Sequence, residues 1–192
     1  MEMTGWTCSA MGADLAVSEA DSIAFRASSL LLDYPGEGDD DVSLVAAAVE
    51  ELPPGEVRER LARFLDWWGG LTVRDREVSY VETFELGAQV SLYLTSPRPE
   101  DRDDRGRNLL RLRDIYLQHG WSFCSGELPD YLPLILEFAA LAPQGAELLT
   151  AQRDLLVGLE RALDNAGSPF AEVVAAVIAV ADGVADVSGR SR

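Results

Sequence analysis

Apolar residues recur at spacings of three and four along most of the chain, in blocks that end at proline or glycine. This spacing places them on one face of an α-helix. The first block holds Ile23, Ala27 and Leu31 and stops at Pro35. The last begins at a Ser168 cap. The pattern predicts an all-α fold, a single-domain bundle of about seven helices.

The breaks between the blocks predict how the chain is organised. Residues 1–14 have no helical period and are expected to be a flexible N-terminus. The helical domain is expected over 15–183, with a polar hinge loop at 96–104 and a disordered tail at 184–192. Residues 142–165 are expected to form one long helix.

One segment allows two interpretations. The stretch from Arg74 to Leu92 has helical spacing, yet Val90, Leu92 and Leu94 alternate as in a short strand. A helix is the preferred prediction, because no second strand is evident with which these residues could pair.

Charge and cysteine content narrow the class of function. The 192 residues carry 33 acidic and 16 basic side chains, all of the latter arginine, for a formal charge of −17. Such a surface repels phosphate backbones and anionic lipid, so no nucleic acid is expected as a partner and no direct membrane insertion. The longest apolar run, 173–181, is too short to span a bilayer. Two distant cysteines and no signal peptide indicate the cytoplasm.

Catalytic motifs are missing from the sequence. It contains no phosphate-binding glycine loop, no nucleophile elbow and no zinc-protease motif. The single histidine, His119, lies five residues before Cys124, but a lone cysteine is more often an inert packed residue. No catalytic residue, metal site or cofactor is therefore expected.

Two segments combine aromatic or apolar residues with acids. In Tyr80–Leu86, Tyr80 and Phe84 would share one helix face and Glu82 would lie on another. In Glu127–Leu132, Glu127 precedes a proline-started helix that has Asp130 in its first turn. For the first segment, periodicity alone favours core aromatics beside solvated acids. The second segment is a good helix entry that would also present two carboxylates and an apolar wall to a ligand, and physical reasoning alone does not choose between these roles.

Several stretches in order resemble the NarJ family, the delta-type assembly chaperones of respiratory nitrate reductase. The resemblance covers most of residues 23–165. It rests on Leu31-Leu-Asp-Tyr-Pro35, Tyr80-Val-Glu-Thr-Phe84, Ser91-Leu-Tyr-Leu-Thr95, Arg105-Gly-Arg-Asn-Leu-Leu-Arg-Leu112 and Glu127-Leu-Pro-Asp-Tyr-Leu-Pro133, followed by Leu136-Glu-Phe-Ala-Ala140.

The resemblance implies a non-catalytic chaperone. It would bind the catalytic molybdenum subunit of nitrate reductase, including its N-terminal signal-like peptide, until molybdenum cofactor and iron–sulfur insertion are complete. A homodimer is a possibility that the sequence leaves open. The expected peptide-binding groove accepts an amphipathic helix. Its residues would be Tyr80, Glu82, Phe84, Tyr93, Glu127, Pro129, Asp130 and Leu132.

Three alternatives stay open at this point. The client could be another molybdoenzyme of the dimethyl sulfoxide reductase type. The chain could be a scaffold subunit that remains in the mature complex. It could also be a nucleotide-binding enzyme that uses Glu127 and Asp130, although the acidic charge opposes a phosphate ligand.

Overall fold

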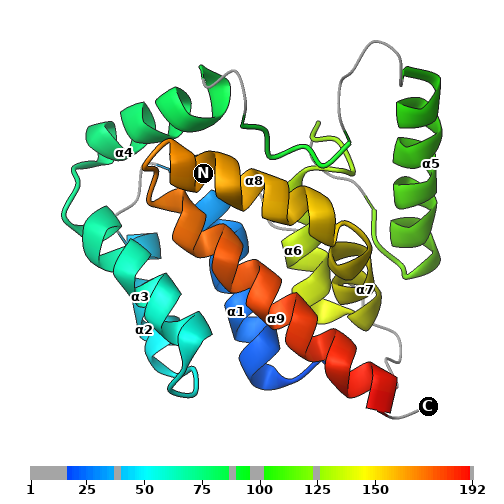
Figure 1. Ribbon diagram of the computed structural model, residues 1–192, viewed down its shortest axis with the longest axis horizontal. Coiled ribbons are helices and arrows are strands. Elements are labelled where there is room, and N and C mark those ends of the chain that lie inside the picture. The colour runs from blue at the N-terminus through cyan, green and yellow to red at the C-terminus, as the bar shows by residue number, and fades with distance from the viewer. Residues whose placement is uncertain (1–16, 37–39, 87–89, 96–101, 123–125, 191–192) are drawn as a thin grey trace.

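The computed structural model describes residues 17–36, 40–86, 90–95, 102–122 and 126–190 (Figure 1). Within them, nine α-helices and one π-helix are the regular elements, which confirms the all-α class and exceeds the expected count of seven. The elements are α1 (Glu19–Leu32), α2 (Asp40–Glu50), α3 (Glu56–Gly69), α4 (Val73–Tyr80), η1 (Val81–Glu85), α5 (Arg102–Gln118), α6 (Leu132–Leu141), α7 (Pro143–Ala151), α8 (Arg153–Asn165) and α9 (Phe170–Arg190).

The expected long helix over 142–165 is in fact two helices, α7 and α8, that meet at Gln152. The Gln152 amide donates to the carbonyls of Leu148 and Leu149, both at 3.1 Å, and its φ of −102° and ψ of 14° turn the chain. A straight helix over this segment would be about 35 Å long. The corner instead lets α7 and α8 both pack on α9, which buries Leu149 and Leu156 completely.

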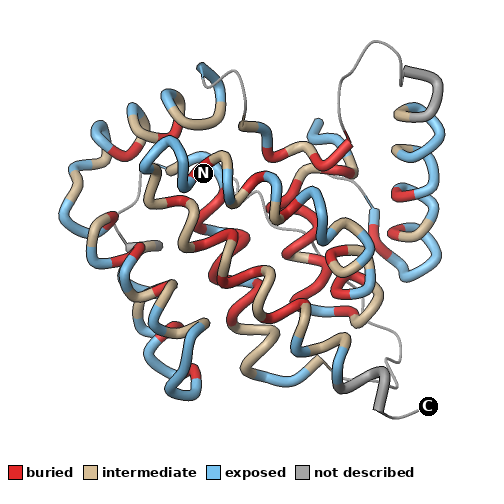
Figure 2. The backbone as a smooth tube through the Cα atoms, viewed as in Figure 1, coloured by how far each residue is buried: buried red, intermediate tan, exposed pale blue. Residues whose placement is uncertain are grey.

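The core lies around α1, α6 and α9. Helix α1 packs most extensively on α6, and α9 contacts α1, α3, α7 and α8. Figure 2 shows the buried positions concentrated along these central helices. Phe25 of α1, Leu136 of α6 and Val177 of α9 have no exposed surface, as expected for the apolar stripes of amphipathic helices.

The α3–α9 contact combines an aromatic cluster with an ion-pair bridge. The Phe170 ring lies 5.1 Å from that of Phe64 and 5.5 Å from that of Trp68. At the edge, Glu172 accepts from Arg60 and Arg63, each at 2.9 Å. These pairs lower the pKa of Glu172, with the Arg63 hydrogen bond as the largest cause. The bridge therefore ties the first turn of α9 to α3.

The α6–α7 turn requires a glycine. A Cβ at Gly145 would lie 2.4 Å from the Cα and the amide nitrogen of Ala139, closer than any side chain allows. The missing side chain lets α7 approach the backbone of α6 directly. Gly145 is itself buried.

The preferred helix over 74–92 is wrong at its end. Helix α4 continues only into η1, where the Leu86 amide donates to the Val81 carbonyl at 2.9 Å. The Leu94 amide then donates to the backbone carbonyl of Asp130 at 3.0 Å, and the Leu132 amide donates to the Leu92 carbonyl at 2.8 Å. These bonds flank an antiparallel bridge of Tyr93 with Tyr131. The alternation of Leu92 and Leu94 does mark an extended segment, because its pairing partner is the loop before α6.

Helix α5 stands at one edge of the molecule, away from the packed helices (Figure 1). It makes no extensive contact with another described helix. Its inner side is held near its C-terminal end by Leu112 and Tyr116, which are 7% and 1% exposed. The Tyr116 hydroxyl donates to the Pro129 carbonyl at 3.2 Å. Most other positions of α5 between 105 and 118 are exposed (Figure 2).

The expected domain limits are described only in part. Residues 1–14 lie outside the described residues, as does most of the expected hinge, although its last residues, 102–104, begin α5. Helix α9 continues to Arg190, through most of the segment expected as a disordered tail. None of the described helices combines the length and apolarity needed to cross a membrane.

Candidate peptide-binding groove

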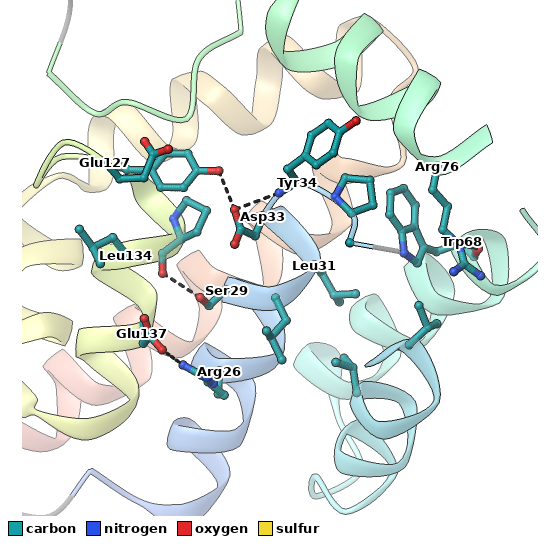
Figure 3. A pocket seen from close by; sticks show the side chains of 17 residues that line it. Arg26, Ser29, Leu31, Asp33, Tyr34, Trp68, Arg76, Glu127, Leu134 and Glu137 are labelled. Atoms are coloured by element: carbon teal, nitrogen blue, oxygen red, sulfur yellow. Dashed lines mark hydrogen bonds and ion pairs between the residues drawn. The ribbon is translucent and has the colours of Figure 1, made fainter. Parts of the chain in front are cut away.

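A cavity of about 440 Å³ opens where the C-terminal end of α1 meets α2, α3 and the start of α6 (Figure 3). Its walls are apolar and polar in about equal measure, and several of the polar side chains are charged. We call this the α1–α6 groove. Its apolar residues are Leu30, Leu31, Tyr34, Pro35, Val42, Val45, Trp68, Pro133 and Leu134; its polar ones are Arg26, Ser29, Asp33, Arg76, Glu127, Tyr131 and Glu137.

The end of α1 presents an acid and an aromatic ring to this groove. The chain leaves the helix at Asp33, whose φ of −83° and ψ of 163° are extended. Pro35 enforces the exit, because the residue before a proline disfavours helical geometry. The Tyr34 amide then donates to the Asp33 carboxylate at 2.9 Å (Figure 3). Leu30 and Tyr34 remain 47% and 49% exposed, so they are available for contact with a ligand.

Two tyrosine hydroxyls connect α1, α4 and α6 behind the groove. Tyr131 donates to Asp33 at 3.1 Å, and its oxygen lies 3.0 Å from that of Tyr80. Tyr80 also donates to the Leu32 carbonyl at 3.3 Å. Burial raises the pKa of Tyr80 to about 12 and raises that of Tyr131 even further. Both phenols therefore stay protonated and serve as donors at neutral pH.

The second acid of the groove, Glu127, is held by Tyr93. The Tyr93 hydroxyl donates to the Glu127 carboxylate at 2.8 Å, and its ring lies 5.2 Å from that of Tyr131. Burial, followed by the hydrogen bond to Glu127, raises the pKa of Tyr93 to about 12. The bridge between the segments of Tyr93 and Tyr131 thus brings Glu127 and Asp33 to the same groove.

Two arginine side chains also line the groove. Arg26 pairs with Glu137 across α1 and α6, beside a Ser29 hydroxyl that donates to the Pro133 carbonyl at 2.8 Å (Figure 3). Arg76 is only 6% exposed; it donates to the Trp68 carbonyl at 2.9 Å and its guanidinium lies 5.8 Å from the centre of the Trp68 ring. Both arginines of the groove therefore have partners within the protein.

A comparison with known proteins identifies the family. The family model described as nitrate reductase delta subunit matches residues 50–176. The chain belongs to this family. It is 32% identical over 165 residues to the probable nitrate reductase molybdenum cofactor assembly chaperone NarJ of Bacillus subtilis. The match covers 84% of this chain and 90% of that protein. The NarJ resemblance seen in the sequence is confirmed.

Two further relatives are matched over less of their own length. The nitrate reductase molybdenum cofactor assembly chaperone NarJ of Escherichia coli K12 is 34% identical over 131 residues, 66% of this chain and 55% of that protein. The nitrate reductase-like protein NarX of Mycobacterium tuberculosis H37Rv is 33% identical over 162 residues. That match covers 83% of this chain but only 24% of NarX.

The predicted site residues of this family member do not all reach one surface. Glu127 lines the α1–α6 groove directly. Tyr80 and Tyr93 support it through Tyr131, by a hydrogen bond and a ring contact. Phe84 packs instead against Phe170, with ring centres 4.8 Å apart. Leu132 is a core residue with no exposed surface.

Glu82 lies elsewhere. It lines a second cavity of about 650 Å³, between η1 and the α8–α9 turn. Ser168, also in this lining, was expected to cap α9, yet its hydroxyl is buried without a hydrogen-bond partner among the described residues. Glu82 and Glu127 therefore do not form one rim.

Asp130 was expected on the rim but is completely buried. One carboxylate oxygen accepts from the Thr95 amide at 3.1 Å and from the Thr95 hydroxyl. The other has no hydrogen-bond partner in the described part of the chain. Pro129 is half-buried, and its carbonyl accepts from Tyr116. Asp130 therefore holds the segment that ends at Thr95, and Pro129 holds α5; neither residue lines the groove.

Sequence reasoning missed Asp33, Tyr34 and Tyr131 as groove residues. All three fall within stretches that carry the family resemblance, Leu31–Pro35 and Glu127–Pro133, so the signal for them was present. Trp68 and Arg76 carried no such signal, because they reach the groove only through packing between α3 and α4.

The residues considered for metal binding or catalysis have the following surroundings in the described structure. They contain no group of three or more His, Cys, Asp or Glu side chains that could hold a metal ion. The Nδ1 of His119 lies 2.9 Å from the Ile115 carbonyl, and its ring packs on Phe138. Cys124, considered as its partner, lies outside the described residues. Because Asp130 is buried and Glu127 is exposed, the two do not form a carboxylate pair that a nucleotide could reach.

Proposed function

We propose that this protein is a non-catalytic assembly chaperone for the catalytic molybdenum subunit of a nitrate reductase. It would act in the cytoplasm and hold the subunit until molybdenum cofactor and iron–sulfur insertion are complete. The observation that carries the proposal is the family match over residues 50–176, together with a 32% identical relative named as such a chaperone and covered over 90% of its length.

The α1–α6 groove is the proposed binding site for the client's N-terminal signal-like peptide. Half-exposed Leu30 and Tyr34 provide the apolar contact, in the manner of helix-in-groove recognition. Asp33 and Glu127 provide negative charge for a basic residue of the peptide. The donors that hold the Asp33 carboxylate in the described residues, Tyr131 and the Tyr34 amide, are neutral, so its charge remains available.

Calorimetry with the client's N-terminal peptide tests the site. Leu30→Ser should weaken binding about fivefold, because burial of half a leucine side chain contributes about 1 kcal/mol. Asp33→Asn should weaken it by a similar factor, and more at low salt. The matched control is Leu155→Ser on α8, since Leu155 is 46% exposed and lies outside the groove.

The possible outcomes test the peptide-binding site separately from the chaperone role. Equal losses for Leu30→Ser and Leu155→Ser would exclude the α1–α6 groove as the peptide site. Absence of heat at about 100 µM peptide would exclude recognition of that peptide. The chaperone role has its own test: affinity capture from cells unable to make the cofactor should retain the catalytic subunit, and capture from cofactor-replete cells should not.

A further inference from the structure

Helix α5 exposes an apolar stripe on the side opposite its buried contacts. Leu110 and Leu117 are each 51% exposed and lie seven residues apart, so they are aligned along two helical turns. Leu112 and Tyr116, which hold α5 to the body, lie on the other side of the helix. The stripe therefore faces away from its own chain.

The same helix concentrates positive charge in an acidic protein. Over residues 102–118 it has five arginines and three aspartates, a net charge of 5 − 3 = +2. All other residues together carry −17 − 2 = −19. Arg113 lies between the two exposed leucines along the helix and pairs with the exposed Asp114 at 3.6 Å; Arg107 and Arg111 are also exposed. The outer face of α5 thus combines exposed leucines with an excess of arginine over aspartate.

The α1–α6 groove has the complementary chemistry. It combines half-exposed Leu30 and Tyr34 with the carboxylates of Asp33 and Glu127. The buried contacts of Leu112 and Tyr116 fix α5 with its stripe turned outward, so its own groove cannot receive it. A second copy of the chain can present its groove to the stripe.

We propose that two copies of this protein associate by placing the outer face of α5 of each copy in the α1–α6 groove of the other. A reciprocal contact of this kind closes into a two-fold dimer and uses each surface once. The inference rests on the same groove as the proposed function. It adds that α5 mimics the client peptide and covers the groove when no client is present.

Competition follows directly. Because one groove cannot hold both helices, a bound client peptide must weaken the dimer by the factor by which the dimer weakens peptide binding. The interface is small, since it uses one exposed helix face per copy, so dissociation in the micromolar range is expected. A fresh client would release the chaperone as a monomer.

Sedimentation velocity over about 1–300 µM of the full chain tests the association. The unmodified protein should shift from monomer toward dimer, and Leu110→Ser combined with Leu117→Ser should raise the dimer dissociation constant at least tenfold. The control pair is Leu141→Ser with Leu155→Ser, which removes leucines of 56% and 46% exposure from other helices and should leave the constant unchanged. A protein that stays monomeric at 300 µM overturns the proposal.

Photo-crosslinking locates the contact. With benzoylphenylalanine in place of Leu117, and a mixture of ¹⁴N- and ¹⁵N-labelled chains, mixed-isotope crosslinks should map to the groove segments 26–36 and 131–137. Crosslinks confined to other segments, or to one chain, overturn the proposal. Loss of the dimer on adding client peptide supports both the inference and the proposed function. A dimer through α5 in a protein that binds no client peptide supports the inference alone.

Discussion

The Thr95 amide and hydroxyl both donate to one oxygen of the buried Asp130 carboxylate, across 35 residues of chain. The pair adjoins the backbone bonds between Leu94 and Asp130 and between Leu92 and Leu132. It therefore decides whether the segment before α5 stays attached to the start of α6, next to the groove residues Glu127 and Tyr131.

Asp130→Ala should lower the free energy of unfolding by about 2 kcal/mol, because the buried Thr95 amide loses its acceptor. Asp130→Asn, which keeps an acceptor oxygen, should cost less. Thr95→Val removes only the hydroxyl and should cost about 1 kcal/mol. Urea unfolding followed by circular dichroism measures the free energy of unfolding of each variant and so ranks the three. If Asp130→Ala is as stable as the unmodified protein, the pair does not hold the segment.

Gly145→Ala should destabilise the protein by about 3 kcal/mol, at the upper end of the cost of overpacking, because the added Cβ would meet the backbone of α6. The matched substitution is Gly158→Ala. An added Cβ at Gly158 meets nothing within 4 Å, and the residue lies in the interior of α8. This change should stabilise the protein by about 0.5–1 kcal/mol through helix propensity. Chemical denaturation of both variants measures the difference, and equal effects would contradict the close α6–α7 approach.

Glu172→Gln should reduce stability by about 1 kcal/mol at pH 7, in line with a partly exposed ion-pair network. Because Arg63 and Arg60 lower the pKa of Glu172 in the folded state, its contribution is complete above the unfolded value of about 4.3. The contribution is lost as pH falls through the lower folded pKa. The difference in the free energy of unfolding between the variant and the unmodified protein should therefore be constant from about pH 5 to 8. It should disappear in more acidic solution.

Denaturant titrations at several pH values check the direction of this pH dependence. Asp164→Asn serves as the control, because Asp164 is exposed on α8 and makes no ion pair within the described structure. A gap that widens on acidification would mean that the bridge between α3 and α9 does not favour the carboxylate form.

Four of the five tyrosines should ionise above the ordinary value of about 10. Burial raises the pKa of Tyr80 and Tyr93 to about 12 and that of Tyr116 and Tyr131 further. Their protonated forms contribute stability that is complete below the unfolded pKa and lost as pH rises through the folded values. Ultraviolet titration of tyrosinate should thus show late, cooperative ionisation that coincides with unfolding.

The variant Tyr131→Phe tests the assignment within this group. It should remove one late-ionising tyrosine and lower stability by about 1 kcal/mol, since the hydroxyl that bonds Asp33 is lost. If these four tyrosines of the unmodified protein ionise near pH 10 while the protein remains folded, the buried network is absent in solution.

Local periodicity predicted the helices well where each helix has its own stripe and its own stop signal. It failed at Leu92–Leu94, because the hydrogen-bond partners of an extended segment lie far along the chain, at Asp130 and Leu132. It also merged α7 with α8, since a corner at Gln152 needs no proline or glycine. Both errors come from tertiary packing, which a helix period does not encode.

The candidate site was predictable to a smaller degree. Glu127 was predicted as a site residue and lines the α1–α6 groove, but the sequence could not show that Asp130 points inward. Asp130 was expected in the first turn of a helix, where a carboxylate is usually solvated, but α6 begins only at Leu132. Here Thr95 supplies donors from a distant segment, and only the folded arrangement makes burial possible.

The bridge of Tyr93 with Tyr131 has a topological consequence. It pins together the two ends of residues 96–129, so α5 lies within a closed loop and reaches the core only through its inner side, at Leu112 and Tyr116. The entropic cost of closing such a loop rises by only about 0.6 kcal/mol for each doubling of its length. The connections on either side of α5 can therefore change in length at little entropic cost, whereas Leu112 and Tyr116 tie the helix itself to the core.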